Sequence, residues 1–200
     1  ANVNWIDGVL MTHDHADQSH GIDDLRMVAL NGRRRVDVWM DEATSRTLTR
    51  RFDYCFTQLP GSGYPAILNE HRISEFGVPI RIEGAGGTIE AIPFDQDHGN
   101  IRSLGFRFGP LAYSADVVGV PEDSFAILEG VDTWILDALR YAPHPTHAHL
   151  DLSMEWLENR HVNLGILTNM HVDLDYQTLV RDLPESVRPA YDGMVLEFDI

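Results

Sequence analysis

The stretch Thr12–Leu25 reads THDHADQSHGIDDL and follows Trp5–Met11, an apolar run with the character of a β-strand. His13 and His15 stand two residues apart and Asp17 keeps the same spacing, so in an extended chain all three side chains point to one side. Imidazole nitrogens and carboxylate oxygens are the ligands that zinc, manganese and iron(II) take in catalytic sites. An exposed polar loop would not account for three alternating ligand types directly after an apolar strand. The segment therefore predicts a metal site just past a strand end.

The composition limits the class of protein. The 200 residues include 31 Asp and Glu against 15 basic residues, all of them Arg, for a net charge of −16. The hydrophobic share of 44% supplies a sizeable core, which excludes a disordered chain. One cysteine, Cys55, excludes an internal disulfide and a Cys-based zinc site. No apolar run is long enough to span a membrane and no secretory signal is visible, so we expect a cytoplasmic protein with no membrane partner.

Short β-rich runs alternate with helical stretches along the chain. The predicted strands are Trp5–Met11, Val36–Met40, Pro79–Glu83, Thr88–Phe94, Leu104–Phe108, Leu111–Ser114, Thr133–Ala138, Leu164–Asn169 and Met194–Phe198. The predicted helices are Gly21–Leu30, a helix from an Asp41 N-cap to Tyr54, Glu122–Leu128, Asp151–Arg160 and Asp175–Leu183. This order predicts an α/β protein with two layers of sheet covered by helices, in a single domain over residues 1–200.

Three later segments place a ligand-type residue after a predicted strand. They are Asp97-His98-Gly99, Tyr113-Ser114-Ala115-Asp116 and Leu167-Thr168-Asn169-Met170-His171. Together with T-H-x-H-x-D, and in this order, they make nearly the whole chain resemble the metallo-β-lactamase superfamily. The resemblance implies an αββα four-layer sandwich and a metal-dependent hydrolase.

Other segments resemble particular branches of this superfamily. GIDDLR, LGFRFGPLAYSADV and THAHLDLSMEWL are similar to the cyclic-ribose phosphodiesterases of phosphonate degradation and, more distantly, to tRNA 3′-end-processing endonucleases. The resemblance implies a phosphodiesterase that acts on a small nucleotide, a cyclic nucleotide or a ribose cyclic phosphate. It also implies two divalent ions, zinc or manganese, and a homodimer.

The same resemblance implies a set of metal ligands. Those of the first ion are His13, His15 and His98, those of the second are Asp17 and His171, and Asp116 bridges the two. The acids that are candidates to orient the ligand imidazoles are Asp14, Asp95, Asp97 and Asp173.

Catalytic roles follow from the resemblance as well. A metal-activated hydroxide attacks phosphorus, with Asp17 at the catalytic centre. His149, on the loop that enters a predicted helix, is expected to protonate the leaving oxygen. His147 is the alternative for that role and a candidate substrate contact.

Two features depart from the family pattern. Gln18 stands where the family has a further His, and a neutral amide oxygen is a poorer ligand than imidazole. Three outcomes are open: two ions with one weakened, one ion only, or a metal harder than zinc. Only twelve residues precede His13, whereas relatives carry several strands there. We therefore expect the N-terminal strands of the fold to be missing from this chain.

Three other functions are weighed against the phosphodiesterase. An RNA-processing nuclease of the same superfamily is disfavoured because a net charge of −16 does not suit a long nucleic acid. β-Lactam or thioester hydrolysis would use the same metal site but fits the YSAD and THAHLD segments less well. A ligand-binding homologue with weakened catalysis is suggested by Gln18 alone.

Overall fold

The computed structural model describes residues 4–198. The chain forms two compact units. The first comprises the described residues through Glu75 together with Ile82–Thr88, and the second comprises Phe76–Arg81 and the described residues from Ile89 onward. Within residues 4–198 no helix is long and apolar enough to cross a membrane. The single-domain organisation expected from the sequence stays a prediction.

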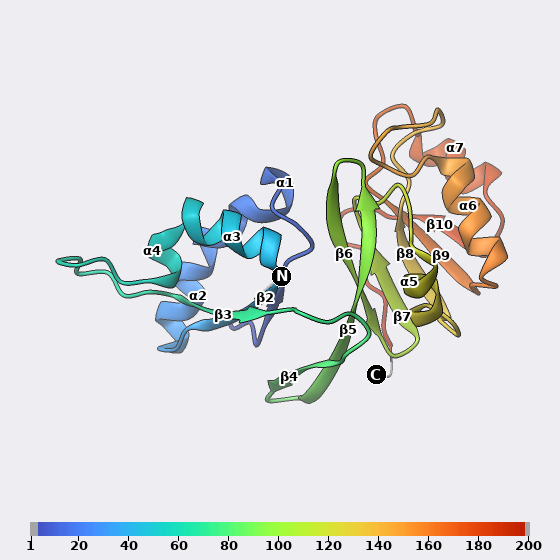
Figure 1. Ribbon diagram of the computed structural model, residues 1–200. Coiled ribbons are helices and arrows are strands. Elements are labelled where there is room, and N and C mark those ends of the chain that lie inside the picture. The colour runs from blue at the N-terminus through green and yellow to red at the C-terminus, as the bar shows by residue number, and fades with distance from the viewer. Residues whose placement is uncertain (1–3, 199–200) are drawn as a thin grey trace. The chain divides into compact units, whose positions relative to one another are not determined.

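The first unit is built on a small parallel sheet with short helices (Figure 1). Its strands lie in the order β1–β2–β3, and both pairs are parallel. The elements in chain order are β1 (Val9–Leu10), α1 (Ala16–Ser19), the 3-10 helix η1 (His20–Asp24), α2 (Leu25–Gly32), β2 (Val36–Met40), α3 (Glu42–Arg51), α4 (Asp53–Phe56) and β3 (Leu68–Arg72). Parallel strands need long crossover connections, and the helices provide them.

Alternation along β2 explains how this sheet is covered. Val36, Val38 and Met40 are buried, whereas the residues between them are partly exposed. Leu48 of α3 and Cys55 of α4 belong to the same apolar cluster. Because alternate side chains of a strand point to opposite faces, one face of β2 carries the helices.

Helix α3 begins where the sequence predicts, at an Asp41 N-cap. The Asp41 carboxylate accepts a hydrogen bond of 2.8 Å from the backbone N–H of Thr44, which would otherwise lack a partner within the helix. We expect Asp41→Ala to lower the free energy of unfolding by about 1 kcal/mol in urea denaturation. Asp41→Asn, which keeps an acceptor oxygen, should lose less than Asp41→Ala. Equal losses in the two variants would contradict the capping role.

The second sheet has seven strands in the order β10–β9–β8–β7–β6–β5–β4. Its elements, with the helices that connect them, are β4 (Ile80–Gly84), β5 (Gly87–His98), β6 (Ile101–Phe108), β7 (Leu111–Ser114), α5 (Glu122–Ile127), β8 (Thr133–Asp137), α6 (Leu150–Asn159), β9 (Leu164–Thr168), α7 (Tyr176–Asp182) and β10 (Val187–Pro189). Strands β5, β6 and β7 are antiparallel neighbours, and β7, β8, β9 and β10 are parallel.

The core of the second unit centres on Trp134 of β8. Its side chain is fully buried, and its indole N–H donates to Ser114 Oγ over 2.9 Å. Phe125 of α5, Trp156 and Leu157 of α6 pack in the same cluster. These apolar contacts hold α5 and α6 against the sheet.

Four strands of this sheet end at the same edge. Strands β5 and β7 are each antiparallel to β6, so they run in one direction, and β8 and β9 are parallel to β7. The carboxyl ends that meet there are His98, Ser114, Asp137 and Thr168. Ligands of open α/β sheets gather at such an edge.

Most of the predicted elements are present. The helix predicted from Asp41 to Tyr54 is divided at Phe52 into α3 and α4, and three further differences concern strands. Residues 194–198 form no strand, and Val187–Pro189 form the last one instead. Strand β3 was not predicted, because its side chains after Leu68 are mostly exposed and polar and so carry no apolar alternation. The predicted strand Trp5–Met11 is reduced to Val9–Leu10.

Candidate metal centre

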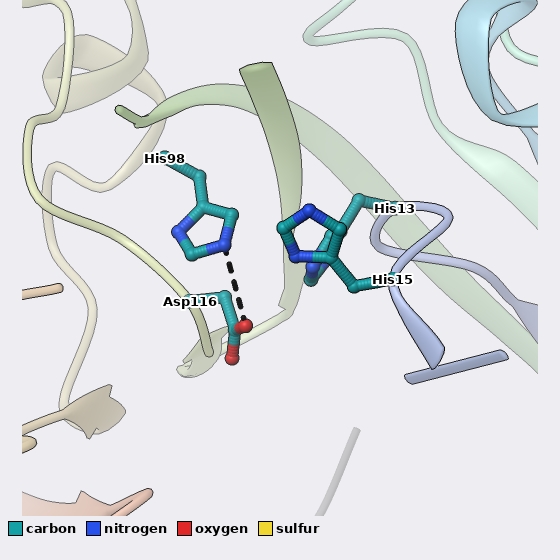
Figure 2. A group of neighbouring side chains, drawn as sticks. All are labelled: His13, His15, His98 and Asp116. Carbon is teal, nitrogen blue, oxygen red and sulfur yellow. Dashed lines mark ion pairs between the residues drawn. The ribbon is translucent and has the colours of Figure 1, made fainter. Parts of the chain in front are cut away.

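His13 and His15 follow the carboxyl end of β1. His13 is buried, and its Nδ1 lies 3.1 Å from the hydroxyl of Thr12. His15 has extended backbone angles and stands directly before α1. The two rings meet edge to face with centroids 4.6 Å apart, as Figure 2 shows. Metal-ligating histidines donate their other ring nitrogen to an oxygen, so a metal at His13 would use Nε2.

Asp17 and Gln18 do not continue this extended stretch. The chain turns into helix α1 at Ala16, so the expected alternation ends at His15. Gln18 Nε2 donates to Asp17 Oδ2 over 3.3 Å. Partial burial opposes ionisation of Asp17, but the bond from Gln18, the backbone N–H and the nearby His13 and His15 outweigh it and lower the pKa of this carboxyl. Among the described residues of the first unit, Asp17 does not join His13 and His15 in a group of metal-type donors.

His98 and Asp116 form a second pair, in the second unit. His98 ends β5, and its Nδ1 lies 2.7 Å from the carbonyl oxygen of Thr146. That carbonyl can only accept, so Nδ1 carries the hydrogen and Nε2 presents its lone pair. Nε2 lies 3.5 Å from Asp116 Oδ2, the contact dashed in Figure 2. Both side chains are buried.

Gly99 lets the loop that carries Thr146 approach His98. Its φ of +73° lies in the region that side chains rarely adopt. A Cβ at this position would lie 2.4 Å from Thr146 Cγ2. The His98-Gly99 dipeptide therefore requires glycine for two independent reasons, backbone conformation and space.

Asp116 is held in an unusual backbone conformation. Its φ is +52°, which a non-glycine residue adopts only when its surroundings impose it. Ser103 Oγ donates to the carbonyl oxygen of Asp116 over 2.8 Å, and Asn169 Nδ2 donates to its Oδ1 over 2.6 Å. The next residue, Val117, donates its N–H to Asp137 over 3.1 Å. These bonds leave Oδ2 of Asp116 directed at His98.

His147 rather than His149 is built into this region. His147 Nδ1 lies 2.7 Å from Asp137 Oδ2, and its ring centroid is 4.8 Å from that of His98. Burial raises the pKa of the Asp137 carboxyl, although the bond to His147 opposes the rise. His149 precedes α6 and makes no capping bond with its side chain. The contacts therefore favour His147 for proton transfer, the role that the sequence assigned first to His149.

His171 lies apart from the pair in its own unit. Its side chain is 53% exposed, and Nδ1 lies 3.2 Å from Asp173 Oδ2. Among the residues of the second unit that the structure describes, His171 does not join His98 and Asp116 in a group of metal-type donors. Asp173 is one of the acids that the sequence offered as candidates to orient an imidazole, and that role stays a prediction. Asp95 and Asp97, two further candidates for that role, both pair with Arg102.

The donor set fits a divalent metal. His13 and His15 in the first unit offer two imidazole nitrogens, and His98 and Asp116 in the second unit offer one imidazole nitrogen and one carboxylate oxygen. Within the second unit, the 3.5 Å between His98 Nε2 and Asp116 Oδ2 is close to the separation of about 3.3 Å that two ligands of one tetrahedral zinc ion show. Both atoms are acceptors or lone-pair donors, so a cation between them relieves their repulsion.

Comparison with known proteins decides the family. Residues 1–171 match the family described as the beta-lactamase superfamily domain. This chain belongs to the beta-lactamase superfamily. Its fold is that of the metallo-β-lactamase hydrolases, as expected from the sequence, with mixed α/β structure and two sheets.

Two solved structures of the superfamily are similar to the chain. A diphosphatase of the PhnP family is 33% identical, with a TM-score of 0.86 over 99% of this chain and 74% of that one. The short form of human tRNase Z is 16% identical, with a TM-score of 0.65 over 98% of this chain and 80% of that one. The first relationship extends to sequence, whereas the second shows the shared fold alone. Both agree with the resemblances expected from the sequence.

One curated relative is much longer than this superfamily member. A Porphyromonas gingivalis protein named octanoyltransferase is 25% identical over 197 residues. The alignment covers 97% of this chain but only 38% of that protein. The name therefore describes a protein of which this chain matches a little over a third.

Three residues of the site were not predicted. Asp137, Thr146 and Asn169 hold His147, His98 and Asp116, respectively. Asp137 and Asn169 end or directly follow buried strands, which is a signal that the sequence carries. The Thr146 contact uses a backbone carbonyl, which every residue has, so the residue type gives no sign of it in the sequence.

Proposed function

We propose that this chain is a metal-dependent phosphodiesterase that cleaves a small phosphodiester, such as a cyclic nucleotide or a ribose cyclic phosphate. The observation that carries the proposal is the buried His98–Asp116 pair, with Nε2 and Oδ2 at a separation suited to one metal ion. The 33% identical PhnP-family relative, described as a diphosphatase, supports a phosphoryl substrate.

Different residues of the chain are proposed for metal binding and for catalysis. The residues proposed to hold the ion are His13, His15, His98 and Asp116. A bound zinc or manganese ion supplies a strong nucleophile from water at neutral pH and positive charge for the phosphoryl oxygens. Asp17 stays a candidate at the catalytic centre, and zinc and manganese both stay candidates for the metal.

Proton transfer to the leaving oxygen is assigned to His147. Asp137 Oδ2 already accepts from the Val117 N–H, so it also accepts from His147 Nδ1. This fixes the ring and directs Nε2 away from Asp137, and Nε2 carries the proton to be transferred when the ring is in its imidazolium form. Asp137 acts through His147 and is a positioning residue.

The decisive experiment measures turnover of bis(p-nitrophenyl) phosphate by the full chain. Protein loaded with zinc or manganese should turn it over at least about tenfold faster than protein stripped by a chelator, and metal return should restore the rate. A loaded protein without turnover would refute the phosphodiesterase and favour the weakened ligand-binding homologue.

Diphosphate hydrolysis is the second candidate, because the PhnP-family relative is described as a diphosphatase. A dinucleoside diphosphate and a cyclic nucleotide, compared at equal concentration, separate the two. An RNA-processing nuclease would instead prefer a long RNA, which the net charge of −16 disfavours. The homodimer and the cytoplasmic location stay predictions.

A further inference from the structure

A cleft of about 380 Å³ in the first unit borders the arginine run of residues 33–35. Its walls are the last turn of α2, the arginine run itself and residues 65–67, which lead into β3. The walls stand at the amino ends of β2 and β3, whereas His13 follows the carboxyl end of β1. Because the three strands are parallel, the cleft and His13 lie at opposite edges of the sheet, about 16 Å apart along β2.

The charge of this cleft is unlike that of the chain as a whole. The chain has 31 Asp and Glu against 15 Arg, yet of the described residues that line the cleft three are arginines and none is an acid. Arg34 has partners, because its guanidinium lies 3.0 Å from Asp7 Oδ1 and 3.7 Å from the centroid of the Trp5 ring. Within residues 4–198 neither Arg33 nor Arg35 forms an ion pair with an acid. Two uncompensated guanidinium groups therefore border the cleft.

The end of helix α2 does not occupy these arginine side chains. The carbonyl oxygen of Ala29 accepts from the backbone N–H of Arg34 over 3.2 Å. The carbonyl oxygen of Leu30 accepts from the backbone N–H of Arg33 over 3.3 Å. Backbone groups thus satisfy carbonyls that a helix end would otherwise leave open. The side chains of Arg33 and Arg35 remain available to a ligand.

The walls of the cleft are held in place by packing and by a backbone hydrogen bond. A Cβ at Gly32 would lie 2.0 Å from Trp5 Cζ3, so the turn that carries the arginines packs directly on the indole. The backbone N–H of Val36 donates to the carbonyl oxygen of Ile67 over 2.9 Å, which joins the two sides of the cleft. A site that is already ordered loses little freedom when a ligand binds, and this favours affinity.

The lining indicates the kind of ligand. Guanidinium groups bind phosphate oxygens through paired, charge-assisted hydrogen bonds. A phosphate monoester carries about two negative charges at neutral pH, which matches two guanidinium groups. The other lining residues are apolar, among them Leu30, Pro65 and Ile67, and the volume is in the range of small-molecule sites.

We propose that this cleft binds a phosphate monoester with an apolar or aromatic body, of the size of a nucleoside monophosphate. Arg33 and Arg35 hold the phosphate, and the body of the ligand covers the apolar lining. The site is separate from the metal centre, because it lies at the other edge of the first sheet. Its occupancy therefore does not require a bound metal ion.

Titration calorimetry of the full chain with AMP tests the proposal. AMP should bind both to the metal-loaded chain and after chelation. Inorganic phosphate lacks the apolar body and adenosine lacks the phosphate, so each should bind at least about tenfold more weakly than AMP. AMP binding that disappears on chelation would belong to the metal centre and would overturn the proposal. Equal affinities for AMP and inorganic phosphate, or no binding of AMP, would overturn it as well.

Two variants test the arginines themselves. Arg33 has a φ of +53°, a conformation that asparagine accepts more easily than arginine, so Arg33→Asn should fold and lose no thermal stability. It should nevertheless bind AMP about tenfold more weakly, because a charge-assisted pair is lost. Arg35→Gln should show a similar loss. Unchanged affinity for AMP in both variants would refute the site.

Arg50→Gln is the matched control. Arg50 is exposed on α3, forms no ion pair with an acid in the part of the chain that the structure describes, and is not among the residues that line the cleft. The substitution changes the net charge by the same amount as Arg33→Asn. Because salt screens a distant exposed charge, the affinity for AMP should fall by less than about twofold. A loss equal to that of Arg33→Asn would show that AMP responds to net charge and would contradict the proposal.

Discussion

His98→Ala is expected to remove the bound metal and to lower kcat/KM for bis(p-nitrophenyl) phosphate by about 1,000-fold. A metal ion contributes several kcal/mol of charge stabilisation in the transition state, and each 1.36 kcal/mol changes a rate about tenfold. His98 is the buried imidazole whose Nε2 is aligned with Asp116 by the carbonyl of Thr146. Among the described residues of the second unit, no other histidine joins Asp116 in a group of metal-type donors.

The control for this variant is His161→Asn. His161 is exposed and has a φ of +54°, which asparagine accepts, so the substitution introduces no strain. Metal content and kcat/KM should be unchanged. If His98→Ala retained its metal and its rate while His161→Asn behaved like the unaltered chain, the proposed metal site would be wrong. Circular dichroism of each variant would show that the comparison is between folded proteins.

His147→Ala is expected to lower kcat by about 100-fold for a substrate with a poor leaving group, such as a cyclic nucleotide. With p-nitrophenolate, a leaving group that departs without a proton, the loss should be much smaller. The reason is the geometry of His147. Its Nδ1 lies 2.7 Å from Asp137 Oδ2, and its ring packs against the ring of His98. The dependence on the leaving group separates proton transfer from a purely structural role.

His149→Ala is the matched control. This residue was the first choice from the sequence, and its side chain makes no capping bond with α6, so its loss should leave the helix intact. Its kcat for the two substrates should fall by less than that of His147→Ala. If His149→Ala instead showed the greater loss with the cyclic nucleotide, the proton donor would be His149.

The positions of several candidate site residues could be predicted from the sequence, because those residues stand at the ends of apolar strands. An apolar run that stops at a histidine or an aspartate predicts a side chain at a sheet edge, and His98 and Asp116 both lie there. The extended geometry predicted for Asp17 was wrong. Two extended residues predict a third, but the chain becomes helical at Ala16, and α1 turns Asp17 away from that alternation.

Local patterns could not distinguish His147 from His149. Both stand on one loop two residues apart, and both are followed by an apolar residue. The distinction comes from Asp137, ten residues before His147 on β8, whose buried carboxylate contacts His147 and not His149. A contact between a strand end and a later loop depends on how the chain folds back, which spacing along the sequence does not encode.

By itself the sequence determined the superfamily, most of the strands and the residue types of a metal site, because these depend on periodicity and on motifs that are local. Only the tertiary structure decided which of those residues work together. Asn169 and Asp116 are 53 positions apart, yet their side chains meet over 2.6 Å because parallel strands β7 to β9 end at one edge. Spacing along the chain does not encode such a contact, since hydrogen bonds between side chains are fixed by distance in space rather than by order in the chain.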